Sequence, residues 1–167
     1  MVERLSVNIR EATARDLPAM EWEGQYSHLR RLYRQALQEA SNGRALPLVA
    51  LAQDHVVGQL FVQFGRGSVA VEDVASINYL YSFRVRPSFR NQGISTQLLD
   101  RAEAELRERG FERAVIAVAM ENEHARRLYE RRGYRVFAKD PGKWSYVDHQ
   151  GRLRHVSEPA HLLEKVL

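Results

Sequence analysis

One loop of the chain has the residue types of an anion-binding site. Residues 90–95 read Arg-Asn-Gln-Gly-Ile-Ser, and they open directly into an amphipathic segment that ends near Arg109. The first turn of a helix presents unpaired backbone N–H groups and a partial positive charge. Gly93 has no side chain, so the backbone there can approach a ligand closely. This pattern suits a pyrophosphate, and an ordinary strand-to-helix turn is the alternative interpretation.

The same loop argues against two other phosphate-binding classes. It lacks the Gly-Lys-Ser/Thr ending of a P-loop and the three glycines of the dinucleotide-binding fingerprint, so we expect neither an ATPase nor a dinucleotide-dependent enzyme. The chain has no cysteine, which excludes disulfides, thiolate catalysis and Cys-ligated zinc. Its six histidines are dispersed without an i, i+4 pair, so we expect no metal site.

The surrounding elements alternate between helical and extended patterns, which predicts one α/β (α+β) domain over residues 1–167. Apolar patterns predict strands at 5–9, 48–52, 56–64, 76–85, 115–118, 134–138, 144–147, 153–156 and 162–167. Caps and apolar stripes predict helices that begin at Asp16, Leu29, the anion-binding loop and Asn122. The strand at 76–85 alternates most clearly, and we expect five of its side chains on one face: Ile77, Tyr79, Tyr81, Phe83 and Val85.

Charge and hydropathy limit the kinds of binding partner and the cellular compartment that we expect. The net charge of +4 is compatible with a nucleic acid, a phosphate-bearing cofactor or a solvated basic face. The chain has no long Lys/Arg block and no nucleic-acid-binding motif, which argues against a nucleic-acid partner. It has no signal-peptide pattern, and its longest apolar run, residues 114–120, is far shorter than a membrane span. We therefore expect a cytoplasmic protein with no membrane partner.

Two motifs resemble those of a known superfamily. Residues 85–87 and the loop at 90–95 are similar to the (Arg/Gln)-x-x-Gly-x-(Gly/Ala) signature of the Gcn5-related N-acetyltransferase (GNAT) superfamily. Residues 122–134, with Asn122 at their start and a Leu-Tyr-Glu run in the middle, resemble the second motif of that superfamily at the matching spacing. Ser95 replaces the usual Gly or Ala. Since serine is small and can cap a helix, we expect crowding near the phosphates without loss of binding.

The resemblance implies an acyl-CoA N-acyltransferase fold. This fold has a mixed, mostly antiparallel twisted sheet flanked by helices, and the sheet splays between the strands that end near Val85 and Met120. The hairpin predicted at 144–156 is an addition to the minimal pattern, and it is expected to shape either the acceptor site or a dimer interface. A homodimer is an expectation from the superfamily alone.

The resemblance also implies a role for individual residues towards acetyl-CoA. The pantetheine arm would pair with the backbone of three residues, Phe83, Arg84 and Val85. The pyrophosphate would be held by backbone amides of the loop, Arg90, Asn91, Gln92, Gly93, Ile94 and Ser95. Asn122 would contact the arm, and Tyr129 would lie near the sulfur and protonate the departing thiolate. By composition alone, Asn122 is a helix cap and Tyr129 is a core tyrosine.

The acceptor side is less defined. In the superfamily the first two helices and their connecting loop wall the acceptor, which points to Trp22, Glu23 and Tyr26, with Tyr81 below them. An aromatic and acidic wall would suit a cationic amine. The strand before the loop offers no carboxylate as a general base, and Glu23 and the pair Glu72-Asp73 stay open as candidates.

We therefore expect an acetyl-CoA-dependent N-acetyltransferase that acts directly on a primary amine of a small molecule or protein. Direct transfer is favoured because the chain has no cysteine for a covalent intermediate. The alternative is a non-catalytic acyl-CoA sensor that keeps the loop at 90–95 and makes no use of Tyr129.

Overall fold

A computed structural model of the chain describes residues 6–65 and 77–167. The expected start of the first strand at Leu5, most of the expected turn at 65–68 and the candidate bases Glu72 and Asp73 lie outside the described residues. No helix in the described part of the chain combines the length and the apolar composition needed to cross a bilayer.

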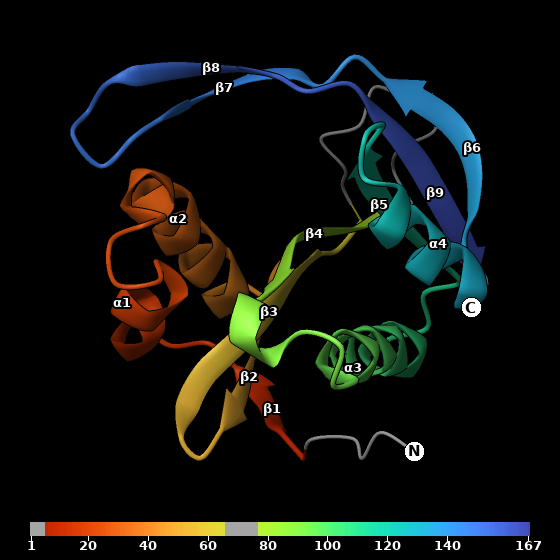
Figure 1. The fold of residues 1–167 in the computed structure, drawn as a ribbon, viewed down its shortest axis with the longest axis horizontal. Helices are drawn as coiled ribbons and strands as arrows, with labels where there is room; N and C mark the ends of the chain where they lie inside the picture. Colours follow the sequence, from red (N-terminus) through yellow and green to blue (C-terminus); the bar gives the residue numbers. More distant parts are fainter. Residues whose placement is uncertain (1–5, 66–76) are drawn as a thin grey trace.

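Seven strands form one sheet in the order β1-β2-β3-β4-β5-β9-β6 (Figure 1). Their bounds are Asn8–Glu11 (β1), Ala45–Ala52 (β2), His55–Gln63 (β3), Asn78–Val85 (β4), Arg113–Ala119 (β5), Arg135–Asp140 (β6) and Ala160–Val166 (β9). The helices are Leu17–Met20 (α1), Arg30–Ser41 (α2), Ile94–Glu108 (α3) and Glu123–Arg131 (α4). A separate hairpin pairs Lys143–Val147 (β7) with Leu153–Ser157 (β8). The expected mixed sheet flanked by helices, with a C-terminal hairpin, is therefore confirmed.

Several of the expected elements differ in extent, and β1, which was expected at 5–9, covers Asn8–Glu11. β2 begins at Ala45 rather than at Leu48, because Ala45 to Pro47 continue the antiparallel ladder with β3. The helix expected from Asp16 is a short α1 of four residues that follows a 3-10 turn. Pro18 in its first turn fits a helix start, whereas left-handed backbone at Trp22 and Glu23 ends the helical path soon after.

The sheet separates two layers of helices, and neighbouring strand residues point into different layers. Leu48 and Ala50 of β2 belong to the core that packs against α3 and α4, whereas Val49 belongs to the core that packs against α1 and α2. All three side chains are fully buried. This alternation is the period of two that a strand covered on both faces requires.

β4 and β5 are the one parallel pair among the described strands, and they stay paired over only three positions. The ladder joins Asn78 to Ala114 and ends where Leu80 meets Ile116. The buried Asn78 side chain fixes the paired end, because its amide donates to the Arg113 carbonyl at 2.9 Å and its oxygen accepts from the Gly65 N–H at 3.0 Å. Beyond Leu80 the two strands separate, as expected from the sequence.

A bulge in β4 changes which side chains share a face. Tyr81 and Arg84 are three positions apart in β4, whereas their partners in β3, Phe61 and Gln59, are two positions apart. Ser82 has a left-handed φ of 53°, and the buried Gln59 amide donates to its carbonyl at 3.2 Å. The extra residue turns the rest of the strand over. The prediction that Tyr81 and Phe83 share one face is therefore wrong: Tyr81 packs towards α1 and α2, and Phe83 packs towards α3 and α4.

The β7–β8 hairpin arches from the β6 and β9 side of the sheet across to α2 (Figure 1). At its tip, Gly151 lies against the Arg31 guanidinium, and the Tyr146 ring lies 6.3 Å from the His28 ring. The hairpin therefore extends along the side of the sheet that α1 and α2 cover.

Asp148 organises the turn of this hairpin. Its buried carboxylate accepts from the Arg154 guanidinium at 2.8 Å and from the backbone N–H groups of Gln150 and Arg152 at 2.9 Å each. The Arg154 hydrogen bond, followed by the backbone donors, lowers the pKa of Asp148 from 3.8 to about 2.

This depressed pKa predicts a pH-dependent stability. Because the folded-state pKa lies below the unfolded-state value, the stabilisation is complete above about pH 4 and is lost as the pH falls towards 2. We expect Asp148→Asn to lower the Tm at pH 6, and we expect the Tm difference from the native protein to shrink between pH 4 and pH 2. Thermal unfolding followed by circular dichroism measures it, and a difference that stays constant over this range would contradict the assignment.

Candidate active site

A cavity of about 250 Å³ opens where β4 and β5 separate, and we call it the slot. Residues from β4, β5, α4 and the β8–β9 link line it: Tyr79, Leu80, Tyr81, Ser82, Phe83, Ile116, Ala117, Val118, Ala119, Asn122, Ala125, Tyr129 and Glu158. Unpaired strand edges in such an opening can hydrogen-bond to an extended amide-containing ligand, as a further strand would.

The candidate anion-binding loop connects β4, whose Phe83 lines the slot, to α3. Asn91 and Gly93 adopt left-handed φ values of 62° and 81°, which turn the chain sharply into the helix. The Arg90 guanidinium donates to the Val85 carbonyl at 3.0 Å, and the buried Ile94 side chain anchors the first turn of α3 in the core. Gln92 donates its side-chain amide to the Ser88 carbonyl at 3.3 Å.

The loop leaves a set of backbone donors free. Among residues 6–65 and 77–167, no acceptor is recorded for the N–H groups of residues 91–96, which include Ser95. These donors surround the start of a helix of 15 residues, where the helix dipole adds positive potential. The arrangement fits a pyrophosphate in its donor set and its charge.

Tyr129 and Asn122 come from α4 and line the slot together. Asn122 caps the helix, since its side-chain oxygen accepts from the Ala125 N–H at 3.1 Å, so the cap is compatible with a position in the slot. The Tyr129 ring is only 7% exposed and stacks on Phe83 at 5.9 Å. Burial raises the pKa of the Tyr129 phenol well above its ordinary value of 10, so the group stays protonated at neutral pH.

A buried polar cluster packs against Tyr129. Tyr134 lies 6.2 Å from it between ring centres and donates its hydroxyl to the buried Glu103 carboxylate at 3.0 Å. Lys165 of β9 donates to the other oxygen of Glu103 at 2.7 Å. This cluster ties α3 and β9 together beneath the start of β6, and it leaves the Tyr129 ring little freedom to shift.

Two stacked tyrosines of β4 form another part of the slot lining. The Tyr79 and Tyr81 rings lie 5.9 Å apart and nearly parallel, and Tyr81 also packs edge-on against Phe61. Burial raises the pKa of each phenol to about 12, with smaller contributions from the negative charge of Asp140 on Tyr79 and of Glu39 on Tyr81. Neither phenol is therefore ionised at neutral pH.

The predicted acceptor wall already contacts two cations of the chain itself. The Arg84 guanidinium lies 3.6 Å from the centre of the Tyr26 ring and 5.3 Å from that of Trp22. Arg86 forms a two-pronged ion pair with Glu23, with both N–O distances at 2.9 Å. An incoming ammonium would have to compete with these contacts. Of the four predicted acceptor residues, the structure places only Tyr81 in the slot lining.

Sequence reasoning missed two features of this region. Glu158 lines the slot, although no sequence motif marks it. Arg84 was considered for its backbone alone, whereas its guanidinium reaches the Met20 carbonyl at 3.0 Å and also contacts the Tyr33 hydroxyl. Neither position carries a local sequence signal, because both depend on where distant segments meet.

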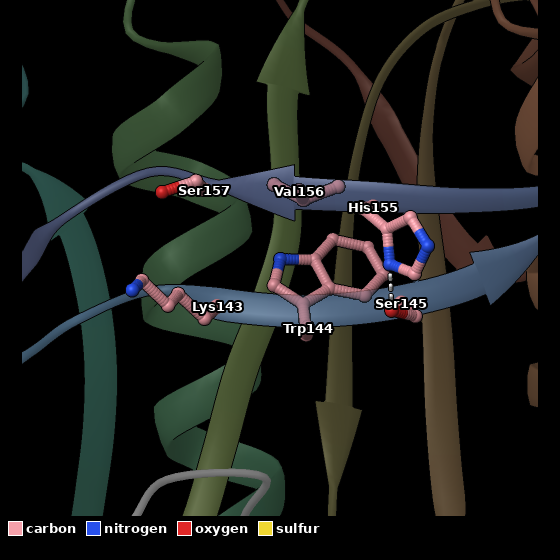
Figure 2. A pocket seen from close by; sticks show the side chains of 6 residues that line it. All are labelled: Lys143, Trp144, Ser145, His155, Val156 and Ser157. Carbon is pink, nitrogen blue, oxygen red and sulfur yellow. Dashed lines mark hydrogen bonds between the residues drawn. The ribbon is translucent and has the colours of Figure 1, made fainter.

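A second cavity, of about 340 Å³, lies on the hairpin and is separate from the slot (Figure 2). Six hairpin residues line it: Lys143, Trp144, Ser145, His155, Val156 and Ser157. The Ser145 hydroxyl and the His155 Nδ1 are 2.8 Å apart, and the two residues face each other across the ladder. None of the described residues that line this cavity carries a carboxylate, so we interpret the pair as a cross-strand hydrogen bond. No cluster of three or more metal-ligating side chains occurs in the described part of the chain.

The divided sheet, the buried phenol in the slot and the loop with free amides at the start of α3 fit the class of acyl-CoA-dependent acyltransferases. The comparison with protein families gives the particular family. Residues 9–134 match the acetyltransferase (GNAT) family, and the chain belongs to it. The resemblance seen in the sequence is thus confirmed, and acetyl-CoA is the acyl donor.

Solved structures share the fold at low sequence identity. Ard1 from Thermoplasma volcanium is similar with a TM-score of 0.72 and 19% identity, over 96% of this chain and 97% of that one. The ribosomal-protein-S18-alanine N-acetyltransferase from Escherichia coli gives a TM-score of 0.68 and 21% identity, over 96% and 94% of the chains. A GNAT acetyltransferase from Elizabethkingia anophelis with acetyl-CoA bound gives a TM-score of 0.66 and 17% identity, over 96% of this chain and 98% of that one. No curated protein sequence matches the chain.

Proposed function

We propose that this chain is an N-acetyltransferase that moves an acetyl group from acetyl-CoA directly to a primary amine of a small molecule or a protein. The observation that carries the proposal is the position of Tyr129. Its ring lines the slot opposite the unpaired part of β4, within a family of acetyltransferases. A buried, protonated phenol at that place suits a general acid.

The backbone of the chain provides the donor-binding part of this proposal. The free edge of Phe83 to Val85 in β4 would pair with the pantetheine arm, and the amides of residues 90–95 would bind the pyrophosphate. Acetyl-CoA supplies an activated thioester when it is bound. Asn122 would hold the arm from the α4 side, and Tyr129 would donate its proton to the departing sulfur.

The acceptor must reach the slot as a neutral amine. For a lysine-like amine with a pKa of about 10.4, deprotonation at pH 7 costs about 4.6 kcal/mol, whereas an α-amino group, with a pKa near 8, costs about 1.4 kcal/mol. Positioning the amine against the thioester contributes several kcal/mol more to catalysis. Two structural neighbours are described as ribosomal-protein alanine N-acetyltransferases, so peptides that begin with alanine belong among the acceptors to test.

The experiment that tests this function is release of free CoA from acetyl-CoA over a panel of acceptors. The panel contains small cationic amines, neutral amines, lysine peptides and peptides with free α-amines, and mass spectrometry identifies the acetylated nitrogen. We expect turnover with one acceptor class. Tight acetyl-CoA binding without turnover on any acceptor would support the sensor alternative instead.

A further inference from the structure

Glu158 has the one carboxylate among the described residues that line the slot. It lies in the short link between β8, which ends at Ser157, and β9, which begins at Ala160. The link passes the carboxyl end of β5, where β4 and β5 have separated and where Tyr129 enters from α4. Glu158 and Tyr129 are therefore present in one cavity on different elements.

The backbone of Glu158 is held on both sides. Its N–H donates to the Gly142 carbonyl at 3.1 Å, and the following Pro159 carbonyl accepts from the Met120 N–H at 3.1 Å. Gly142 packs directly against the Glu158 carbonyl, in a contact that only a residue without a side chain allows. These contacts fix the position of the Glu158 backbone, whereas the side chain itself is exposed.

The Glu158 carboxylate has no recorded hydrogen-bond or ion-pair partner within residues 6–65 and 77–167. Other acids near the acceptor side are committed to cations, as Glu21 is to Arg30 and Glu23 is to Arg86. An unpaired carboxylate at the mouth of a reaction slot keeps all of its lone pairs for a ligand.

Groups in the segments packed around Glu158 are poorer proton acceptors. Tyr79, Tyr81 and Tyr129 are protonated phenols at neutral pH, as their raised pKa values indicate. Asp140 of β6 accepts from the Gly142 N–H at 2.7 Å, and the slot lining contains neither Asp140 nor Lys143 of β7 nor His161 of β9.

We propose that Glu158 accepts the proton of the acceptor amine, and this inference rests on the acetyltransferase function proposed above. As the amine nitrogen bonds to the acyl carbon and the carbon–sulfur bond breaks, the surplus N–H proton passes to Glu158, directly or through one water molecule. The sulfur receives the Tyr129 proton. The two groups return to their starting states by exchange with solvent between turnovers, so the balance is one proton gained and one lost.

The test compares Glu158→Gln with the native chain on the acceptor found in the CoA-release panel. We expect kcat/KM to fall by about 10²–10⁴-fold, as for loss of a general base. The acid-side decline of kcat/KM in Glu158→Gln should then follow the protonation of the amine alone. Acetyl-CoA binding, measured by calorimetry, should stay within about threefold. Glu121→Gln is the matched control, because Glu121 is an exposed carboxylate in the link after β5 and does not line the slot.

A conservative variant separates proton transfer from a merely structural role. Glu158→Asp keeps a carboxylate at this position, so it should recover at least tenfold of the kcat/KM that is lost in Glu158→Gln. No recovery in Glu158→Asp, or an unchanged pH profile in Glu158→Gln, would overturn the assignment of Glu158. Absence of turnover by the native chain would instead overturn the acetyltransferase function, so the two failures are distinguishable.

Discussion

Replacing Tyr129 with phenylalanine should lower kcat by about 10²–10⁴-fold and leave acetyl-CoA binding nearly unchanged. The substitution removes only the hydroxyl, while the ring keeps its stacking on Phe83 and its place beside Tyr134. Among the described residues, no hydrogen bond is recorded for the Tyr129 hydroxyl, so its removal leaves no buried partner unsatisfied there. Steady-state kinetics with the preferred acceptor and calorimetry with acetyl-CoA measure the two quantities.

Tyr146→Phe is the control for this substitution. Tyr146 lies in the hairpin beside His28, outside the slot, and it loses the same atom. Its kcat should stay within about twofold of the native value. A Tyr129→Phe chain that turns over like the control would show that the phenol is not the acid and that Tyr129 serves only as a packed ring.

Gly142→Ala should give the largest loss of stability from a single added methyl group. Gly142 has a φ of +64°, and a Cβ at this position would overlap the Glu158 carbonyl. The left-handed conformation costs about 1–2 kcal/mol for a non-glycine residue, and overpacking adds about 1–3 kcal/mol. We expect the free energy of unfolding to fall by about 2–5 kcal/mol, measured by urea denaturation.

Gly110→Ala separates the two contributions. Gly110 follows α3 with a φ of +82°, and nothing lies within 4 Å of a Cβ built there. It should therefore show the conformational cost alone, near 1–2 kcal/mol. If both variants lose the same stability, the contact between Gly142 and Glu158 is looser than the structure indicates.

The parts of the site that could be predicted from the sequence are those that depend on residues close together in the chain. Gly93 at the start of α3 and Asn122 at the start of α4 are helix-boundary residues, and short-range chemistry fixes their conformation. The family motif extends over those same segments. The separation of β4 from β5, which the resemblance to the family implied, also holds, because their pairing ends where Leu80 meets Ile116.

The parts that sequence could not predict depend on contacts between distant segments. No residue near Ser82 in the sequence indicates a bulge, because the bulge requires Gln59 of the neighbouring strand to hydrogen-bond to Ser82. The wall at Trp22 and Tyr26 was interpreted as open to a cationic acceptor. The bulge directs Arg84 into it from 60 residues further along the chain. A preference for cationic amines thus stays a prediction that the acceptor panel will decide.

Because of the bulge, the number of residues in β4 also decides which side chains face each layer of helices. Upstream of Ser82 the Tyr81 side chain, with Tyr79 stacked on it, faces the layer of α1 and α2. Downstream, Phe83 faces the layer of α3 and α4, beside Tyr129. Loss or gain of one residue at this point would reverse the phase of everything after it and exchange Phe83 with Arg84. A substitution in β4 therefore changes a single side chain, whereas an insertion or deletion there would change the side chains that face both layers of helices.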